Sequence, residues 1–423
     1  MTEEKSGKLI RAVGLWGLVA MCINAVVGSG VFLLPTESYK LLGAFSLWAP
    51  LIFAVPVFIL VLCFAEAASH FTEPGGAYLY ARTAFGDFVG FETGWMNWLA
   101  RLTSLASLSN GFVVSIARFY PPLGAGVPRA AIIIGSLLIL GAIHFVGVRY
   151  GAASIYVFTF GKVLPLVAFI VVALIMFRFN PIPASLHLPG PGTDWSGAAL
   201  FMLFAYAGFE NLGVPAGEYK NPRRDLPMAL LIGILVIAAI YVLTQLGAMS
   251  AVPDLSKTAT PIADAAAALV GTWGAVIITL GALLSIAGTN SGTVLEGSRM
   301  LYALSLDRRA GAVSYVHPKF RTPSVAIVIH VLVAMVLSLA GSFAQMALLS
   351  TVARLTTYLA GCASLPFLGN VTPKRLILAI LGVLVSLTFV ITLHAVNAIA
   401  AAIALIVGAL MYLAVGKSVA PQR

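Results

Sequence analysis

Charged residues are scarce in this sequence. Asp, Glu, Lys and Arg together make up 9% of the 423 residues, whereas about 25% is usual for a soluble protein. This scarcity excludes a water-soluble protein folded around a single core. Hydrophobic residues reach 60% and the mean hydropathy is +1.00. The composition therefore predicts an all-α polytopic membrane protein.

Cysteine is also rare. The three cysteines, Cys22, Cys63 and Cys362, all lie inside apolar runs, where a thiol behaves as a small hydrophobic group. They provide neither a disulfide framework nor the spacing of zinc ligands. We therefore expect no metal and no cofactor. Because no soluble domain interrupts the apolar runs, we also expect no enzymatic activity.

Positive charge is in excess but dispersed. The net charge is +10, and Lys and Arg stand in short clusters between apolar runs, which argues against nucleic-acid binding. We interpret the charge as a membrane-orientation signal. The side opposite the N terminus is expected to carry only five basic residues, Lys40, Arg118, Arg129, Arg178 and Lys257. We therefore predict a cytoplasmic-membrane protein with both termini in the cytoplasm.

Twelve apolar runs are long enough to cross a bilayer, which takes about 20 residues. The predicted spans are 12–35, 41–69, 88–117, 128–147, 151–177, 196–216, 226–250, 266–304, 322–342, 345–369, 375–394 and 396–416. The predicted parts of the chain are a cytoplasmic tail (1–11), a first group of five helices (12–177), an extracellular loop (178–195), a second group of five helices (196–369), two additional helices (370–416) and a second cytoplasmic tail (417–423).

Two runs are interrupted by small and polar residues, at 24–32 in the first run and at 204–211 in the sixth. Glycine at such positions lets a membrane helix unwind, so that its backbone N–H and C=O groups can bind something small. Interruptions at matching positions of two halves indicate the binding site of a transporter. Because five helices are an odd number, the second repeat would be inverted relative to the first.

The first interruption reads Val27, Gly28, Ser29 and Gly30. It would leave several N–H groups unpaired at the positive N-terminal end of the following half-helix, which suits a carboxylate. The alternative is a helix contact made by small residues of the Gly-x-x-x-Gly type, which the Gly-x-Gly spacing fits poorly.

The second interruption has the opposite polarity. The preceding half-helix would end near Ala207 and Gly208, and the carbonyl groups of Phe204, Ala205 and Ala207 would attract an ammonium group. Together the two interruptions predict a clamp for an amino-acid zwitterion. Phe204 and Tyr206 are candidate aromatic lids, with ordinary packing an equal alternative for Tyr206.

Three basic residues, Arg101, Lys162 and Arg354, lie deep in predicted spans. Each costs about 2.5 to 3.5 kcal/mol at this depth, so each should face a cavity or an acidic partner. Glu210 is the only acid that we expect at a similar depth. One carboxylate does not neutralise three cations.

Lys162 is the candidate for losing its proton, because burial favours neutral lysine whereas arginine stays charged. A permanent bond to Glu210 or to a helix carbonyl is an equal alternative. For Arg101 we favour an internal pair with Glu210 over recognition of an acidic substrate side chain.

Four ordered motifs resemble the amino acid–polyamine–organocation superfamily of secondary transporters, and the resemblance covers nearly the whole chain. They are the first-span segment 27–35, the segments 65–71 and 74–78 after the second span, the pair Phe209-Glu210 with the segment 218–224, and the segment 298–303 at the end of the eighth span.

The resemblance implies a LeuT-type fold of 12 transmembrane helices, with helices 1–5 and 6–10 as inverted repeats plus two additional helices. It also implies that Lys162 takes the place of a sodium ion. Proton coupling and obligatory exchange both occur in the superfamily. Arg101 departs from the family, which usually carries a small or neutral residue there.

We therefore expect a sodium-independent amino-acid transporter that works by alternating access and is coupled to protons through Lys162 and Glu210. One alternative is an amine or polyamine exchanger, which would need several carboxylates in the pocket. Another is a nutrient sensor that does not transport. The sequence predicts no oligomeric state.

Overall fold

In the computed structural model, the described residues are 13–71, 76–147, 152–176, 192–212, 219–308 and 311–414. Most of them lie in helices, which turns and short irregular segments connect, and Val13 and Tyr219 form an isolated bridge. The predicted tails 1–11 and 417–423 and residues 178–191 of the predicted outer loop lie outside this part of the chain.

The α-helices are α1 (Leu15–Val26), α2 (Gly30–Leu42), α3 (Ala49–Ala68), α4 (Ala77–Phe85), α5 (Asp87–Ala117), α6 (Gly126–Val146), α7 (Ala152–Ile175), α8 (Trp195–Tyr206), α9 (Pro222–Ala251), α10 (Pro261–Val270), α11 (Thr272–Arg308), α12 (Ser324–Ala340), α13 (Phe343–Ser364), α14 (Pro373–Ile391) and α15 (Ala395–Ala414). Short 3-10 helices are η1 (Gly43–Leu47), η2 (Pro121–Gly124), η3 (Phe209–Asn211), η5 (Leu255–Lys257), η6 (Gly311–Ser314) and η7 (Leu365–Phe367).

Many of these helices suit a bilayer. Within the described residues, eight helices are long and apolar enough to cross a membrane, or nine if the bent pair at Leu15–Val26 and Gly30–Leu47 is one span. Shorter apolar helices, among them α8 and α12, account for other predicted runs. The protein is therefore an all-helical, multi-pass membrane protein. The twelve-span LeuT-type arrangement remains a prediction.

The predicted eighth run, 266–304, has a different start in the structure. α10 ends at Val270, where Gly271 adopts a φ of +75°, and α11 begins at Thr272. A change of direction at one glycine leaves the apolar pattern unbroken, so hydropathy alone merged the two helices. α11 has 37 residues, about 55 Å of helix, which exceeds the roughly 30 Å of a hydrocarbon core.

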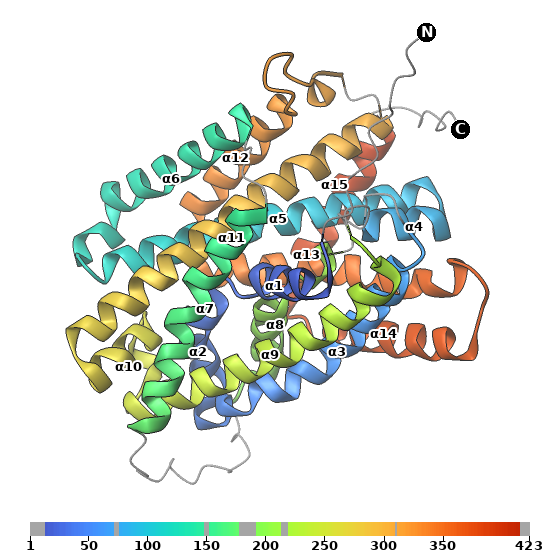
Figure 1. The fold of residues 1–423 in the computed structure, drawn as a ribbon. Helices are drawn as coiled ribbons and strands as arrows, with labels where there is room; N and C mark the ends of the chain where they lie inside the picture. Colours follow the sequence, from blue (N-terminus) through green and yellow to red (C-terminus); the bar gives the residue numbers. More distant parts are fainter. Residues whose placement is uncertain are drawn as a thin grey trace.

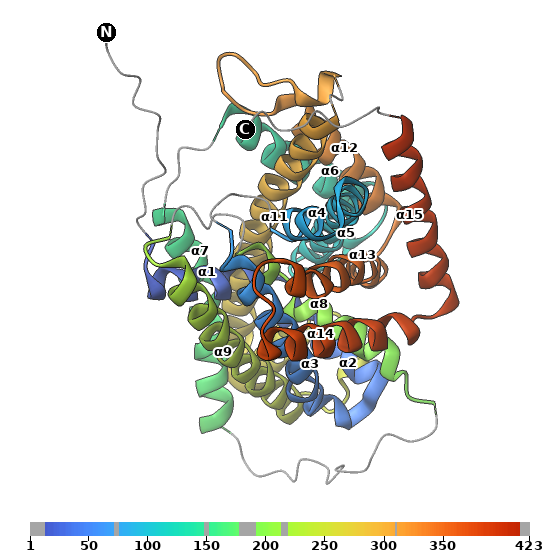
Figure 2. The ribbon, with the colours of Figure 1, turned by 90° about the vertical axis from the view of Figure 1, so that its right-hand side faces the viewer.

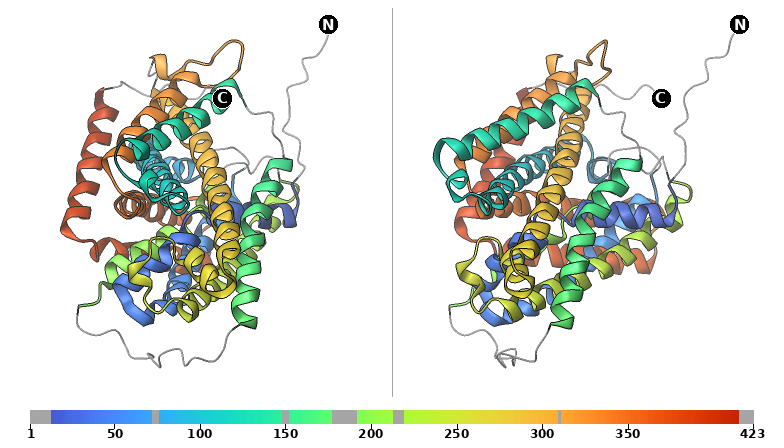
Figure 3. Two further views of the ribbon diagram at one scale, coloured as in Figure 1. Left: turned by 90° about the vertical axis from the view of Figure 1, so that its left-hand side faces the viewer. Right: turned by 60° about the vertical axis from the view of Figure 1, so that its left-hand side comes forward.

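Among the described helices, α5 is buried over most of its length and packs against both α11 and α13. Figure 3 shows α11 crossing the molecule from one end to the other beside α7. α6 and α12 lie side by side at one edge (Figure 1), and α15 stands at the periphery (Figure 2). The interrupted helices are thereby held inside the bundle.

Both predicted interruptions are present. α1 ends at Val26 and α2 starts at Gly30, with a bend of 48° between them. α8 ends at Tyr206, Ala207 is extended with ψ 148°, and Gly208 has a φ of +125° before η3 begins.

The two interruptions touch each other through their glycines. A Cβ atom on Gly30 would lie 3.2 Å from the Cα atom of Ala205, and one on Gly208 would lie 2.5 Å from the carbonyl oxygen of Ala25. No side chain fits at Gly208, and its backbone conformation also favours glycine. Because Gly30 and Gly208 have no side chains, the two breaks can lie against each other in the bundle.

The first prediction tests this contact. Gly208→Ala should lower the apparent unfolding temperature in detergent by more than Gly271→Ala. Both substitutions force alanine into a positive φ, at a cost of about 1 to 2 kcal/mol, but no described atom lies within 4 Å of a Cβ on Gly271. Equal unfolding temperatures for the two variants would show that the approach to Ala25 does not constrain the fold.

Candidate functional site

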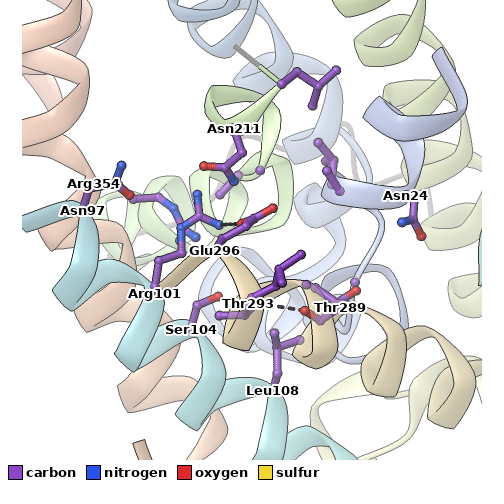
Figure 4. Close-up of a pocket in the computed structure, with 18 of the residues that line it drawn as sticks. Asn24, Asn97, Arg101, Ser104, Leu108, Asn211, Thr289, Thr293, Glu296 and Arg354 are labelled. Atoms are coloured by element: carbon purple, nitrogen blue, oxygen red, sulfur yellow. Dashed lines mark hydrogen bonds and ion pairs between the residues drawn. The ribbon is translucent and has the colours of Figure 1, made fainter. Parts of the chain in front are cut away.

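A cavity of about 660 Å³ lies between α1, α5, α8, α11 and α13, and both interruptions line it. Figure 4 shows polar side chains from α5 and α11 pointing into it, among them Asn97, Arg101, Thr293 and Glu296. Of the predicted substrate-binding residues, those that line the cavity are Gly28, Ser29, Gly30, Arg101, Phe204, Ala205, Ala207 and Gly208. The predicted residues therefore meet in one enclosed space, with one exception.

That exception is Val27, which is fully buried and does not line the cavity. Its carbonyl oxygen points away and accepts hydrogen bonds from Lys162 Nζ at 2.8 Å and Ser285 Oγ at 3.3 Å. Our placement of Val27 among the substrate contacts is thus not supported by the geometry. The hydrogen bonds of the Val27 carbonyl instead stabilise the first interruption.

The first interruption presents amide groups to the cavity. The N–H of Val27 still bonds the carbonyl of Ile23, and α2 resumes with the N–H groups of Phe32 and Leu33 on the carbonyl of Ser29. The N–H groups between these points stand at the start of a helix, where intrahelical acceptors are lacking. Ser29 Oγ has no hydrogen-bond partner among the described atoms. This end of the cavity therefore presents hydrogen-bond donors.

The second interruption presents carbonyl groups, although two of the three predicted ones are partly occupied. The hydroxyl of Tyr241 donates to the carbonyl of Ala205 at 2.7 Å, and the N–H of Ala207 donates to the carbonyl of Phe204 at 3.2 Å. Tyr206 is fully buried and donates to the carbonyl of Pro50. Tyr206 is therefore a packing residue, whereas Phe204 lines the cavity.

Four charged side chains form a cluster beside the second interruption. Glu210 accepts hydrogen bonds from Arg354 Nε at 2.9 Å, from Tyr358 at 3.3 Å and from the N–H of Gly208 at 2.8 Å. Arg101 Nη2 lies 3.6 Å from Glu210 Oε1, while Arg101 Nη1 donates to Glu296 Oε2 at 2.6 Å. The two carboxylates balance the two guanidinium groups.

Glu296 corrects the expectation that Glu210 is the only deep acid. It lies in α11, inside the run that we treated as continuous apolar sequence, and close to the segment 298–303 that we placed at the end of a span. The signal that could have found it is its spacing from Thr289. Seven residues are two helical turns, so the two side chains share a face of α11.

Lys162 stands apart from this cluster. It is fully buried in α7, and its Nζ donates to the carbonyls of Asn24 and Val27 at 3.0 and 2.8 Å and contacts Thr289 Oγ1 at 3.4 Å. The alternative of a salt bridge to Glu210 is wrong, since Glu210 pairs with Arg101 and Arg354. Lys162 lies behind the first interruption and binds the carbonyl groups that the break exposes.

Among the described residues, the cavity runs from the interruptions along α11 to Arg299, Met300 and Ala303 and reaches Tyr78 of α4. By contrast, the void beside Phe32 and Leu33 measures only about 10 Å³. The described part of the structure thus has open space on the α4 side of the interruptions and tight packing beside Phe32 and Leu33.

Characterised proteins from several organisms are similar to this chain. A serine/threonine exchanger of Bacillus subtilis is 29% identical over 352 residues, covering 80% of this chain and 78% of its own. An arginine/ornithine antiporter of Pseudomonas aeruginosa is 31% identical over 328 residues, covering 73% and 65%. A b(0,+)-type amino acid transporter of Mus musculus is 26% identical over 363 residues, covering 80% and 72%.

A sequence model of the family described as amino acid permease matches residues 13–415. That match includes both interruptions, the charged cluster and Lys162. The chain therefore belongs to the amino acid permease family.

Proposed function

We propose that the protein is a sodium-independent amino-acid transporter of the cytoplasmic membrane that works by alternating access, with both termini in the cytoplasm. The observation that carries the proposal is that two interrupted helices present opposite backbone ends to one cavity. The relatives named above, which are transporters or exchangers of amino acids, support it.

In this proposal the amino acid binds as a zwitterion. Its carboxylate accepts hydrogen bonds from the N–H groups of Gly28 to Gly30, at the positive end of α2, and its ammonium group donates to the carbonyls at the end of α8. The carbonyl of Ala207 is the natural acceptor, because Tyr241 and Ala207 itself already donate to Ala205 and Phe204. Asn24 Oδ1 and Ser29 Oγ, which lack partners among the described atoms, add polar contacts.

The one-sided cavity supports alternating access. In the predicted orientation, the open end near α4 faces the cytoplasm, and the closed end at Phe32, Leu33 and Ile262 faces outward. Closing the first end and opening the second would carry the site from one side of the membrane to the other. The glycines of the two breaks let α2 and α8 move against α1 and η3 without side-chain collisions.

Lys162 is the proposed coupling residue, with Glu210 holding the second break. The ammonium group of Lys162 binds two carbonyls of the first break, which is the kind of position that a cation would fill. Loss of its proton would remove the charge and weaken these contacts, so that proton movement would change the first break itself.

A second candidate is amino-acid exchange without a proton. The Bacillus relative is an exchanger and the Pseudomonas relative is an antiporter, and this observation favours the second candidate. The two candidates differ in one requirement, since an obligatory exchanger needs amino acid on both sides of the membrane.

The second prediction tests the site. An amino acid that the purified protein binds should lose affinity by about tenfold or more when its carboxylate is converted to a methyl ester or its amino group is acetylated, because each change removes a charge-assisted contact. Titration calorimetry or thermal shift measures this. Equal affinity for the derivatives would remove the clamp from the proposal.

The third prediction tests coupling in proteoliposomes. A gradient of one pH unit, acid outside, should drive about tenfold accumulation of the amino acid at one proton per substrate. Lys162→Met, which keeps the apolar stem and removes the ammonium, should abolish this dependence. Lys257→Met, at a side chain that is 83% exposed, should keep it.

Two other outcomes are informative. Unchanged pH dependence in folded Lys162→Met would remove Lys162 from the coupling mechanism. Uptake that needs amino acid inside the liposomes and ignores the pH gradient would identify an exchanger.

A further inference from the structure

A short helix covers the tightly packed end of the structure, beside Phe32 and Leu33. α10 and the segment before it contribute Thr260, Ile262 and Ala263 to the wall of the small void there, and α2, α5 and α11 contribute the rest. Ile262 and Ala263 are buried, and α10 packs against α2, α9 and α11 (Figure 1). Space beside Phe32 can therefore open only if these contacts separate.

Asp264 connects α10 to α5. It lies in the first turn of α10, and its Oδ1 atom is 3.1 Å from Nη2 of Arg118, the residue that follows α5. The side chains of Arg118 and Asp264 are 35% and 33% exposed. An ion pair that water reaches contributes little stability, so this pair can form in one conformation and separate in another.

The same carboxylate connects α10 to α2 through the segment before α10. Asp264 Oδ2 accepts hydrogen bonds from the hydroxyl groups of Thr258 and Thr260. The carbonyl of Thr258 in turn accepts a hydrogen bond from Thr36 Oγ1 at 2.8 Å. Thr36 is buried and lies in α2, the half-helix that begins at the first break. One carboxylate thus links the half-helix α2, the covering helix α10 and the central helix α5.

We propose that Asp264 is a latch, whose contacts with Arg118 and Thr258 keep the structure closed beside Phe32 and Leu33 and separate when this end opens. The inference rests on the proposed alternating access. It adds the contacts that have to be released on the side away from α4 before the site can face that side of the membrane.

The test measures how fast a charged methanethiosulfonate reagent modifies a cysteine placed at the void in the purified protein. Ser115→Cys and Thr279→Cys are the reporters, because both residues line the void, are 2% exposed and belong to different helices, α5 and α11. Arg118→Met and Asp264→Asn should each raise the rate at both reporters by about two- to fivefold, the factor that corresponds to an ion pair of this exposure.

Thr36→Val tests the second connection. It removes the hydroxyl group that binds the carbonyl of Thr258 and keeps the shape of the side chain, so it should also raise both rates.

Lys257→Met is the matched control. Lys257 and Asp254 form an ion pair of 3.1 Å, but they lie within one short loop and join no two helices, so this variant should leave both rates unchanged. Each variant is also measured without a reporter. The three natural cysteines are buried, and their reaction would reveal unfolding.

The outcomes separate the latch from the transport function. Rates in Arg118→Met and Asp264→Asn that equal those of the reporters alone would overturn the latch, whether or not the protein transports amino acids. A rise at Ser115→Cys alone would also overturn it, since that result indicates loosening of α5 near Arg118 without opening of the end. A rise at both reporters in a protein that transports no amino acid would support the latch and contradict the transport function.

Discussion

A helix can break inside a membrane only where other groups replace the hydrogen bonds that the break removes, and the centre of this protein is organised around that requirement. At the first break, Lys162 and Ser285 donate to the exposed carbonyls of α1. At the second, Glu210 accepts from the N–H of Gly208, and Tyr241 donates to the carbonyl of Ala205. A cation supports carbonyls at one break, and an anion supports an amide at the other.

The two charged supports differ in how they are balanced. Glu210 is surrounded by Arg354, Tyr358 and, at longer range, Arg101, so its charge is fixed by partners on two other helices. Among the described residues, the hydrogen-bond partners of Lys162 are two carbonyl oxygens and one hydroxyl oxygen. An ammonium group is stabilised less by neutral oxygen atoms than by a negatively charged carboxylate. The charge at the first break is thus held by neutral partners, and the charge at the second by groups of opposite charge.

Much of the site could be predicted from sequence because glycine and charge are conspicuous in apolar runs. Gly28, Gly30 and Gly208 located both breaks to within a residue or two. Val27 lies outside the cavity lining, which the sequence does not reveal because residue spacing does not show the direction of a carbonyl group. Glu296 was missed although it lies inside the predicted span 266–304. Its partner Arg101 is 195 residues away in the sequence, so the sequence does not show that the two charges pair.

The errors in the predicted boundaries of the spans have a similar origin. Hydropathy measures how apolar a segment is, and it does not register a turn made by one glycine such as Gly271. It also does not detect α4, a short helix whose mixture of Tyr and Arg side chains is neither clearly apolar nor clearly polar. Composition predicted an all-helical membrane protein, whereas hydropathy did not predict where each helix begins.

The charged cluster and Lys162 are joined through α11, which contacts both. Thr289 contacts Lys162 at the first break, and Glu296, two turns along the same helix, pairs with Arg101 beside the second. A change in the pair between Glu296 and Arg101 would alter the contacts of α5 with α11, while a proton that leaves Lys162 would alter those of α7 with α1 and α11. Both events act on α11, so its position relative to the two breaks is where binding energy and the proton would be combined.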